Sequence, residues 1–179
     1  MENEQAENKL FTTLPEKYGD KYAEHLFAQY KIYIESAERI SDRRQKTNEF
    51  FLSLNTALVT LLGFIAIKIN SGQFFYAILL ASISGMVICF FWYRIILSYK
   101  GLNGGKFKII HLIEKKLPLM LYETEWEILE RGENKKIYWS FTNIETKIPW
   151  VFVVIYGILF IESIPWIRMI HCLSSLLKL

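Results

Sequence analysis

Residues 50–67 read FFLSLNTALVTLLGFIAI, and six positions later residues 74–93 read FFYAILLASISGMVICFFWY. Neither stretch holds a charged residue, and each is about as long as a helix must be to cross ~30 Å of hydrocarbon. A backbone in lipid has to satisfy its own hydrogen bonds, so both stretches are expected to be helices. Two buried helices of a soluble core would need surrounding layers that 179 residues hardly supply. The pair therefore predicts a transmembrane helical hairpin.

The composition fits one membrane module joined to a cytoplasmic portion. The chain is 52% hydrophobic, and its net charge of +3 is too small to indicate nucleic-acid binding across the whole chain. Its two cysteines, Cys89 and Cys172, show neither ligand spacing nor a disulfide framework and are expected to be free thiols. The first 49 residues contain no apolar signal region, so the hairpin itself is expected to direct insertion.

Basic residues lie on one side of the hairpin. A cluster before the first span consists of Arg39, Arg43, Arg44 and Lys46, and the residues after the second span include Arg94, Lys100, Lys106 and Lys108. The connector holds only Lys68. The positive-inside rule therefore places the N-terminus and the middle of the chain in the cytoplasm. The cluster is expected to set topology and contact anionic lipid, although a ring of copies would also attract RNA or phosphate.

A third apolar stretch covers residues 149–161, and Glu162 and Pro165 interrupt its continuation. Counted through Trp166 it can span the membrane; ended at Ile161 it would be a re-entrant or interfacial helix. We favour the full span, with residues 168–179 as a short amphipathic tail. The predicted fold is all-α, with a cytoplasmic helix over 1–49, the hairpin over 50–93, a cytoplasmic helical region over 94–148, and the third membrane segment and tail over 149–179.

Apolar residues recur at spacings of three and four in both cytoplasmic parts, as they do on one face of a helix. The first such face comprises Tyr22, Leu26, Tyr30, Tyr33, Ala37 and Ile40. The second comprises Phe107, Ile110, Ile113 and Leu117. The first helix is expected to run on into the first span. Gly101, Gly104 and Gly105 are expected to interrupt the helix that leaves the bilayer.

Polar groups inside the spans are the candidate functional residues. The pore-lining candidates are Ser53, Asn55, Thr56, Thr60 and Glu162. Several hairpins around an axis would turn the hydroxyl and amide groups toward a water-filled pore, and a ring of Glu162 would attract cations. Two structural alternatives stay open, namely an interhelical hydrogen bond for Asn55 and an interface position for Glu162. Ala81, Gly85 and Cys89 form a row of small residues that lets another helix approach closely, and we assign it to oligomer packing.

The sequence shows no catalytic, metal or cofactor site. His25, His111 and His171 lie in separate regions without metal-ligand spacing. The Gly101–Gly105 segment lacks the preceding strand and the following Lys-Ser/Thr of a phosphate loop. Arg168 and His171 stand too close together for the Arg-spacer-His motif of one RNase type. We therefore expect a protein that is not an enzyme.

A long ordered string, from Arg39-Ile-Ser-Asp-Arg-Arg through Thr47-Asn-Glu-Phe-Phe to Leu58, resembles the signature of RipA-family octameric bacterial membrane proteins. The segment from Trp92 to Pro118 and the pair Glu125-Trp126 continue the resemblance, which covers residues 30–156. Within that group the chain is similar in size and layout to the membrane accessory protein of type VI-B CRISPR systems, the partner of the RNA-guided RNase Cas13b.

The resemblance implies an octameric pore in the bacterial inner membrane that permeabilises or depolarises the cell when Cas13b detects phage RNA. A divergent RNase of the HEPN type is a second implied activity, which the missing Arg/His spacing opposes. A membrane-anchored scaffold or stress-response protein without conductance is the alternative from another class.

Overall fold

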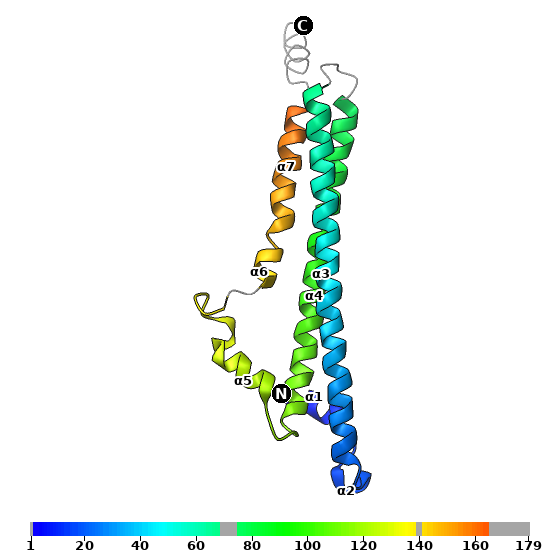
Figure 1. Cartoon of the computed structure of the whole chain (residues 1–179), viewed down its shortest axis with the longest axis vertical. Coiled ribbons are helices and arrows are strands. Elements are labelled where there is room, and N and C mark those ends of the chain that lie inside the picture. The colour runs from blue at the N-terminus through cyan, green and yellow to red at the C-terminus, as the bar shows by residue number, and fades with distance from the viewer. Residues whose placement is uncertain (1, 69–74, 139–140, 165–179) are drawn as a thin grey trace, which may run out of the picture. The chain divides into compact units, whose positions relative to one another are not determined.

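The computed structural model describes residues 2–68, 75–138 and 141–164 and is 84% helical, without a strand in those ranges. This confirms the all-α class. The helices in chain order (Figure 1) are α1 (Glu2–Leu10), α2 (Pro15–Tyr18), α3 (Tyr22–Lys68), α4 (Phe75–Glu114), α5 (Leu121–Ile128), the 3-10 turn η1 (Glu130–Gly132), α6 (Phe141–Glu145) and α7 (Ile148–Glu162). The predicted connector beyond Lys68 and the predicted tail lie outside the described residues.

Three helices are long and apolar enough to cross a membrane: α3, α4 and the helical segment over residues 143–162. The predicted membrane helices of the hairpin are thus confirmed, together with a third helix long and apolar enough to span, and that this third helix crosses fully stays a prediction. At 1.5 Å per residue, the 47 residues of α3 extend about 70 Å, more than twice the thickness of the hydrocarbon. As predicted, the N-terminal amphipathic helix runs into the first span without a break.

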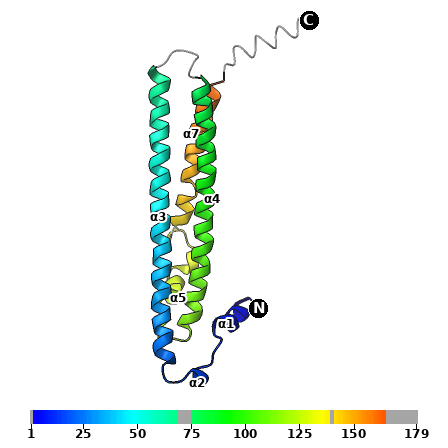
Figure 2. The ribbon, with the colours of Figure 1, turned by 90° about the vertical axis from the view of Figure 1, so that its right-hand side faces the viewer.

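The chain divides into two compact units, residues 1–44 with 99–140 (unit 1) and residues 45–98 with 141–179 (unit 2). In unit 2 the membrane parts of α3, α4 and α7 lie side by side (Figure 2). Leu62, Cys89 and Tyr156, one from each helix, form its buried apolar core. Each of the three helices thus buries only a narrow row of side chains against the other two, and most of its remaining apolar side chains are exposed on the surface of the protomer.

The core of unit 1 comes from α3 and α4. Tyr30 and Ala37 of α3 are buried against Ile110 and Ile113 of α4. Leu26, Tyr33, Phe107 and Leu117 pack around them. Both amphipathic faces predicted from the sequence are therefore confirmed, because their apolar stripes meet each other.

The expected break at Gly101, Gly104 and Gly105 is wrong, since α4 continues through all three to Glu114. Glycine lowers helix stability by only about 1 kcal/mol relative to alanine. Burial of Ile110 and Ile113 beyond the glycines offsets that cost, because most helical stability in proteins comes from tertiary packing.

Candidate functional site

Asn55 links the three helices of unit 2 from the middle of α3. Its side chain is fully buried, and its amide donates to the Phe51 carbonyl oxygen at 2.8 Å. Its Oδ1 accepts hydrogen bonds from Cys89 Sγ of α4 at 3.2 Å and from Tyr156 Oη of α7 at 3.1 Å. One amide thus satisfies its own polar atoms and two others in an apolar interior. This position fits the interhelical hydrogen bond better than a pore lining.

Gly85 lets α7 approach α4 closely. A Cβ added there would lie 2.5 Å from Cζ of Tyr156, closer than real Cβ contacts. Cys89 and Ala81 of the same row also belong to the core that holds Tyr156. The helix that uses this row is therefore α7 of the same chain, and a role in oligomer packing stays a prediction.

Aromatic side chains close the end of this bundle nearest residue 48. Trp92 is 1% exposed, donates its indole N–H to Asn48 Oδ1 at 2.9 Å, and stacks on Phe51 with ring centroids 5.7 Å apart. Phe152 of α7 lies at 6.2 Å from the Trp92 ring. These pairs join the three spans at a second level.

Ser53, Thr56 and Thr60 all lie exposed on α3, in contrast to Asn55. Lys46 and Glu49 are exposed as well and precede them at the same alternation of three and four residues. Thr60 donates its hydroxyl to the carbonyl of Thr56 at 2.8 Å, so it needs no outside partner. We call these five residues the α3 polar stripe. Its three hydroxyl residues give the first span a polar strip on the surface of the protomer, and Lys46 and Glu49 continue that strip before the span.

Glu162 is exposed and is the last residue of α7. That end position fits a carboxylate that reaches water, and the predicted cation-attracting ring stays a prediction. Within the basic cluster, Arg39, Arg43 and Lys46 are exposed and Arg44 is half-buried. Arg39 lies 3.9 Å from Glu35 in a pair about 60% exposed, which contributes little stability.

Glu114 is the polar centre of unit 1 and is fully buried. Its Oε1 accepts from Tyr30 Oη at 2.8 Å and from the Tyr122 N–H at 3.0 Å. Its Oε2 accepts from the Glu123 N–H at 3.2 Å. The carboxylate therefore caps the first turn of α5, where unpaired N–H groups and the helix dipole favour a negative charge. Burial, followed by the bond to Glu114, raises the pKa of Tyr30.

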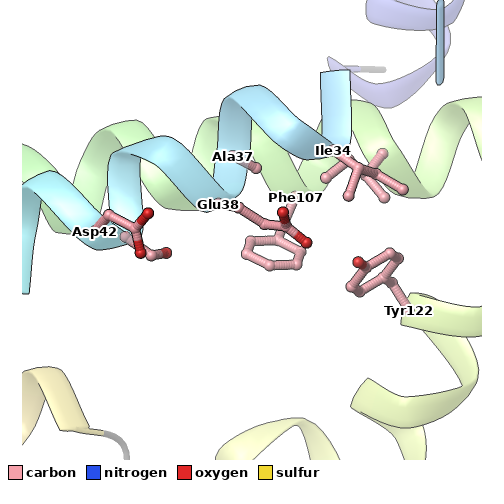
Figure 3. Close-up of a pocket in the computed structure, with 8 residues that line it drawn as sticks. Ile34, Ala37, Glu38, Asp42, Phe107 and Tyr122 are labelled. Carbon is pink, nitrogen blue, oxygen red and sulfur yellow. The ribbon is translucent and has the colours of Figure 1, made fainter. Parts of the chain in front are cut away.

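A groove in unit 1 opens between α3, α4 and the start of α5 (Figure 3). It has a volume of about 240 Å³, and its lining combines apolar side chains with two carboxylates. The residues that line it are Ile34, Ala37, Glu38, Ser41, Asp42, Phe107, Ile110 and Tyr122. We call it the acidic groove.

A model of the octameric membrane protein family (8xMP) matches residues 27–165. The chain belongs to this family. No curated protein and no solved structure gives a significant match. The match covers most of α3 and all of α4, α5 and α7, and it leaves out α1 and α2. Membership and the three apolar helices together establish a membrane location, and the family supports homo-oligomeric assembly.

In this octameric membrane protein family member, the described residues form no group of three or more His, Cys, Asp or Glu that could hold a metal. His25 accepts or donates a hydrogen bond with Tyr18 Oη at 2.8 Å, and His111 lies 2.7 Å from Glu123. Arg168 and His171, the residues weighed for an RNase, lie outside the described residues.

The sequence analysis missed Tyr156, Glu114 and Asn48. Tyr156 is a polar side chain inside an apolar run, and that contrast is the signal that would have found it, whereas Glu114 stands at the end of an apolar stretch beside two lysines. Asn55 lies 101 residues from Tyr156, and Tyr30 lies 84 residues from Glu114, so no local pattern names these two partners.

Proposed function

We propose that this protein assembles as an octameric ring in the bacterial inner membrane and that the ring encloses a water-filled pore. The family description supports the octamer, and the three apolar helices support a membrane assembly. The α3 polar stripe is the observation that carries the pore.

The five stripe residues fall on one side of α3. Spacings of three, four, three and four keep them within about 80° of one another on a helix of 3.6 residues per turn. Hydroxyl groups exposed along one side of a span are suited to line an aqueous lumen. Two residues of opposite charge, Lys46 and Glu49, precede the hydroxyl groups where the pore would meet bulk water.

The other two spans expose mainly apolar side chains. On α4 the exposed large residues include Leu80, Ile83, Val87, Phe90 and Phe91, and on α7 they include Val151, Val154 and Ile158. Within residues 75–93 and 148–162, and apart from the aromatic Tyr76 and Trp150, Ser84 and Glu162 are the exposed side chains that carry a polar group. We therefore assign α4 and α7 to lipid and subunit contacts and α3 to the lumen.

The proposed activity is conduction, with no catalytic step. By the positive-inside rule the N-terminus lies in the cytoplasm. By its resemblance to the accessory protein of type VI-B CRISPR systems, opening of the pore depolarises the cell after Cas13b detects phage RNA and thereby slows phage growth.

Cysteine substitution along α3 tests the lumen assignment in planar bilayers. In a Cys172→Ser background, Ser53→Cys, Thr56→Cys and Thr60→Cys each place a thiol on the stripe, while native Cys89 is buried. A charged, water-soluble thiol reagent is expected to change the current through all three variants. Val154→Cys, on the exposed apolar face of α7, is the matched control and is expected to keep its current. A reconstituted ring without current, or three unreactive stripe positions, contradicts the pore.

A membrane-anchored scaffold is the second candidate function. Exposed apolar side chains on and beside α5 favour it, namely Leu121, Ile128 and Ile137, which are 60%, 70% and 51% exposed. Under this alternative, protein that forms no pore would capture a cytoplasmic partner, and Ile128→Lys would abolish that capture.

A further inference from the structure

One exposed face of α4 in unit 1 carries glycines that the protomer does not need. A Cβ at Gly101, Gly104 or Gly105 would meet nothing within 4 Å, so no packing inside the chain excludes alanine. Each glycine nevertheless lowers helix stability. Exposed Lys100 and Lys108 flank the three glycines, and neither pairs with a carboxylate in the described part of the chain. Because glycine has no side chain, the backbone of another helix or loop can approach α4 closely between the two lysines. We call these five residues the glycine–lysine face.

The acidic groove has the opposite character. Glu38 and Asp42 are exposed one turn apart on α3, above a floor that includes Ala37 and Phe107 (Figure 3). Burial first, and then the charges of Glu38, Glu125 and Glu114, raise the pKa of Tyr122 in the groove wall. The two carboxylates of its lining, Glu38 and Asp42, make the potential in this groove negative, and a cationic, partly apolar occupant would complement it.

The acidic groove and the glycine–lysine face lie at the same height along the axes of α3 and α4, which we call the same level. Lys106 Nζ donates to Ser36 Oγ at 2.8 Å and lies 4.3 Å from the Tyr33 ring centroid, which sets residue 106 of α4 beside residue 36 of α3. Since the two helices are antiparallel, six residues further along bring Asp42 and Lys100 to the same level, about 9 Å from that contact. By the same count Glu38 is level with Gly104, one helical turn from Lys108.

Level matters because a closed ring in a membrane has its symmetry axis along the membrane normal. Each copy then meets the next through two different surfaces, and residues in contact share one level. The acidic groove and the glycine–lysine face meet both conditions: they are complementary in charge, and they are level.

We propose that the acidic groove of one copy receives the glycine–lysine face of α4 from the next copy, so that these two surfaces form the seam between subunits in unit 1. Asp42 pairs with Lys100 of the neighbour at the same level, and Glu38, which is level with the neighbour's Gly104, pairs with its Lys108 one helical turn away, an offset of about 6 Å that the long lysine side chain spans. The three glycines let the α4 backbone approach the apolar floor. The seam rests on the ring of the proposed function and deepens it by naming the surfaces that close the ring.

Charge reversal tests the seam in the full-length protein, with native mass spectrometry of detergent-solubilised rings as the readout. The double variant Glu38→Lys/Asp42→Lys is expected to lose the ring and give smaller species. Adding Lys100→Glu and Lys108→Glu restores opposite charges and is expected to restore the ring. Glu16→Lys/Glu24→Lys, which makes the same charge change at exposed acids away from the groove, is the control and keeps the ring.

Gly105→Leu is a second, uncharged variant, because it adds bulk where the protomer has open space and leaves every charge in place. It is expected to lose the ring while its helical circular dichroism stays that of the parent. A ring that persists in both Glu38→Lys/Asp42→Lys and Gly105→Leu overturns the seam, whether or not it conducts. A ring that responds as expected but passes no current contradicts the pore and leaves the seam standing.

Discussion

At the scale of single residues, the contact between Gly85 and Tyr156 decides whether α7 can lie against α4. Gly85→Ala places a methyl group where the Tyr156 ring tip now lies. Overpacking of this kind costs about 1–3 kcal/mol, so the variant is expected to unfold at a lower temperature in detergent. The change should be followed by tryptophan fluorescence, to which Trp92 of α4 and Trp150 of α7 contribute.

The matched control for this substitution is Gly157→Ala on α7, where a Cβ meets nothing within 4 Å. It should leave stability unchanged or raise it slightly. Tyr156→Leu shortens the clashing side chain, and its combination with Gly85→Ala is expected to be less damaging than the sum of the two single changes. Equal and strictly additive effects would show that the two residues do not share this contact.

At the scale of one element, α5 depends on a carboxylate supplied by α4. Glu114→Ala leaves the Tyr30 hydroxyl and two N–H groups of the first turn without their acceptor. A buried polar group that loses its partner costs about 1–3 kcal/mol. Hydrogen exchange is therefore expected to rise in α5 and to stay unchanged in α7. Glu125→Ala removes an exposed carboxylate of the same helix and should not increase exchange to that extent.

Tyr30 of α3, which donates to Glu114, makes the stability of unit 1 decrease at alkaline pH. Its pKa in the folded protein is raised, mainly by burial and then by the Glu114 hydrogen bond. The neutral phenol therefore contributes stability that is complete below the unfolded pKa of about 10 and is lost as pH rises toward the folded pKa. Helicity measured against pH is expected to fall in the alkaline range, and Tyr30→Phe should make that fall less steep. Burial also raises the pKa of Tyr33 and Tyr122, so some dependence remains. An identical alkaline curve for Tyr30→Phe would contradict the role of this hydroxyl.

At the scale of the whole molecule, periodicity and length predicted which segments are helices and which faces are apolar. Tyr30, Ala37, Ile110 and Ile113 are buried where the spacing placed them. Periodicity does not say which helix covers a face, so the small row at Gly85 predicts a close helix contact without naming α7 as the helix that makes it within the chain. The helix break predicted from local propensity at Gly101–Gly105 is wrong, because packing further along α4 stabilises the helix. Asn55 was correctly singled out as a polar residue in a span, but its partners come from two helices that only the tertiary fold brings to it.

The direction of the spans is the remaining property of the whole molecule that the sequence predicts, and it can be measured with two thiols. An odd number of spans places Glu162 on the opposite side of the membrane from the N-terminus, which the basic residues assign to the cytoplasm. In a Cys172→Ser background, Glu162→Cys is therefore expected to react with a membrane-impermeant reagent in intact spheroplasts. Glu16→Cys, equally exposed in α2, should react only after lysis. If Glu162→Cys also requires lysis, α7 re-enters from the cytoplasmic side instead of crossing, and α3 and α4 alone span the membrane.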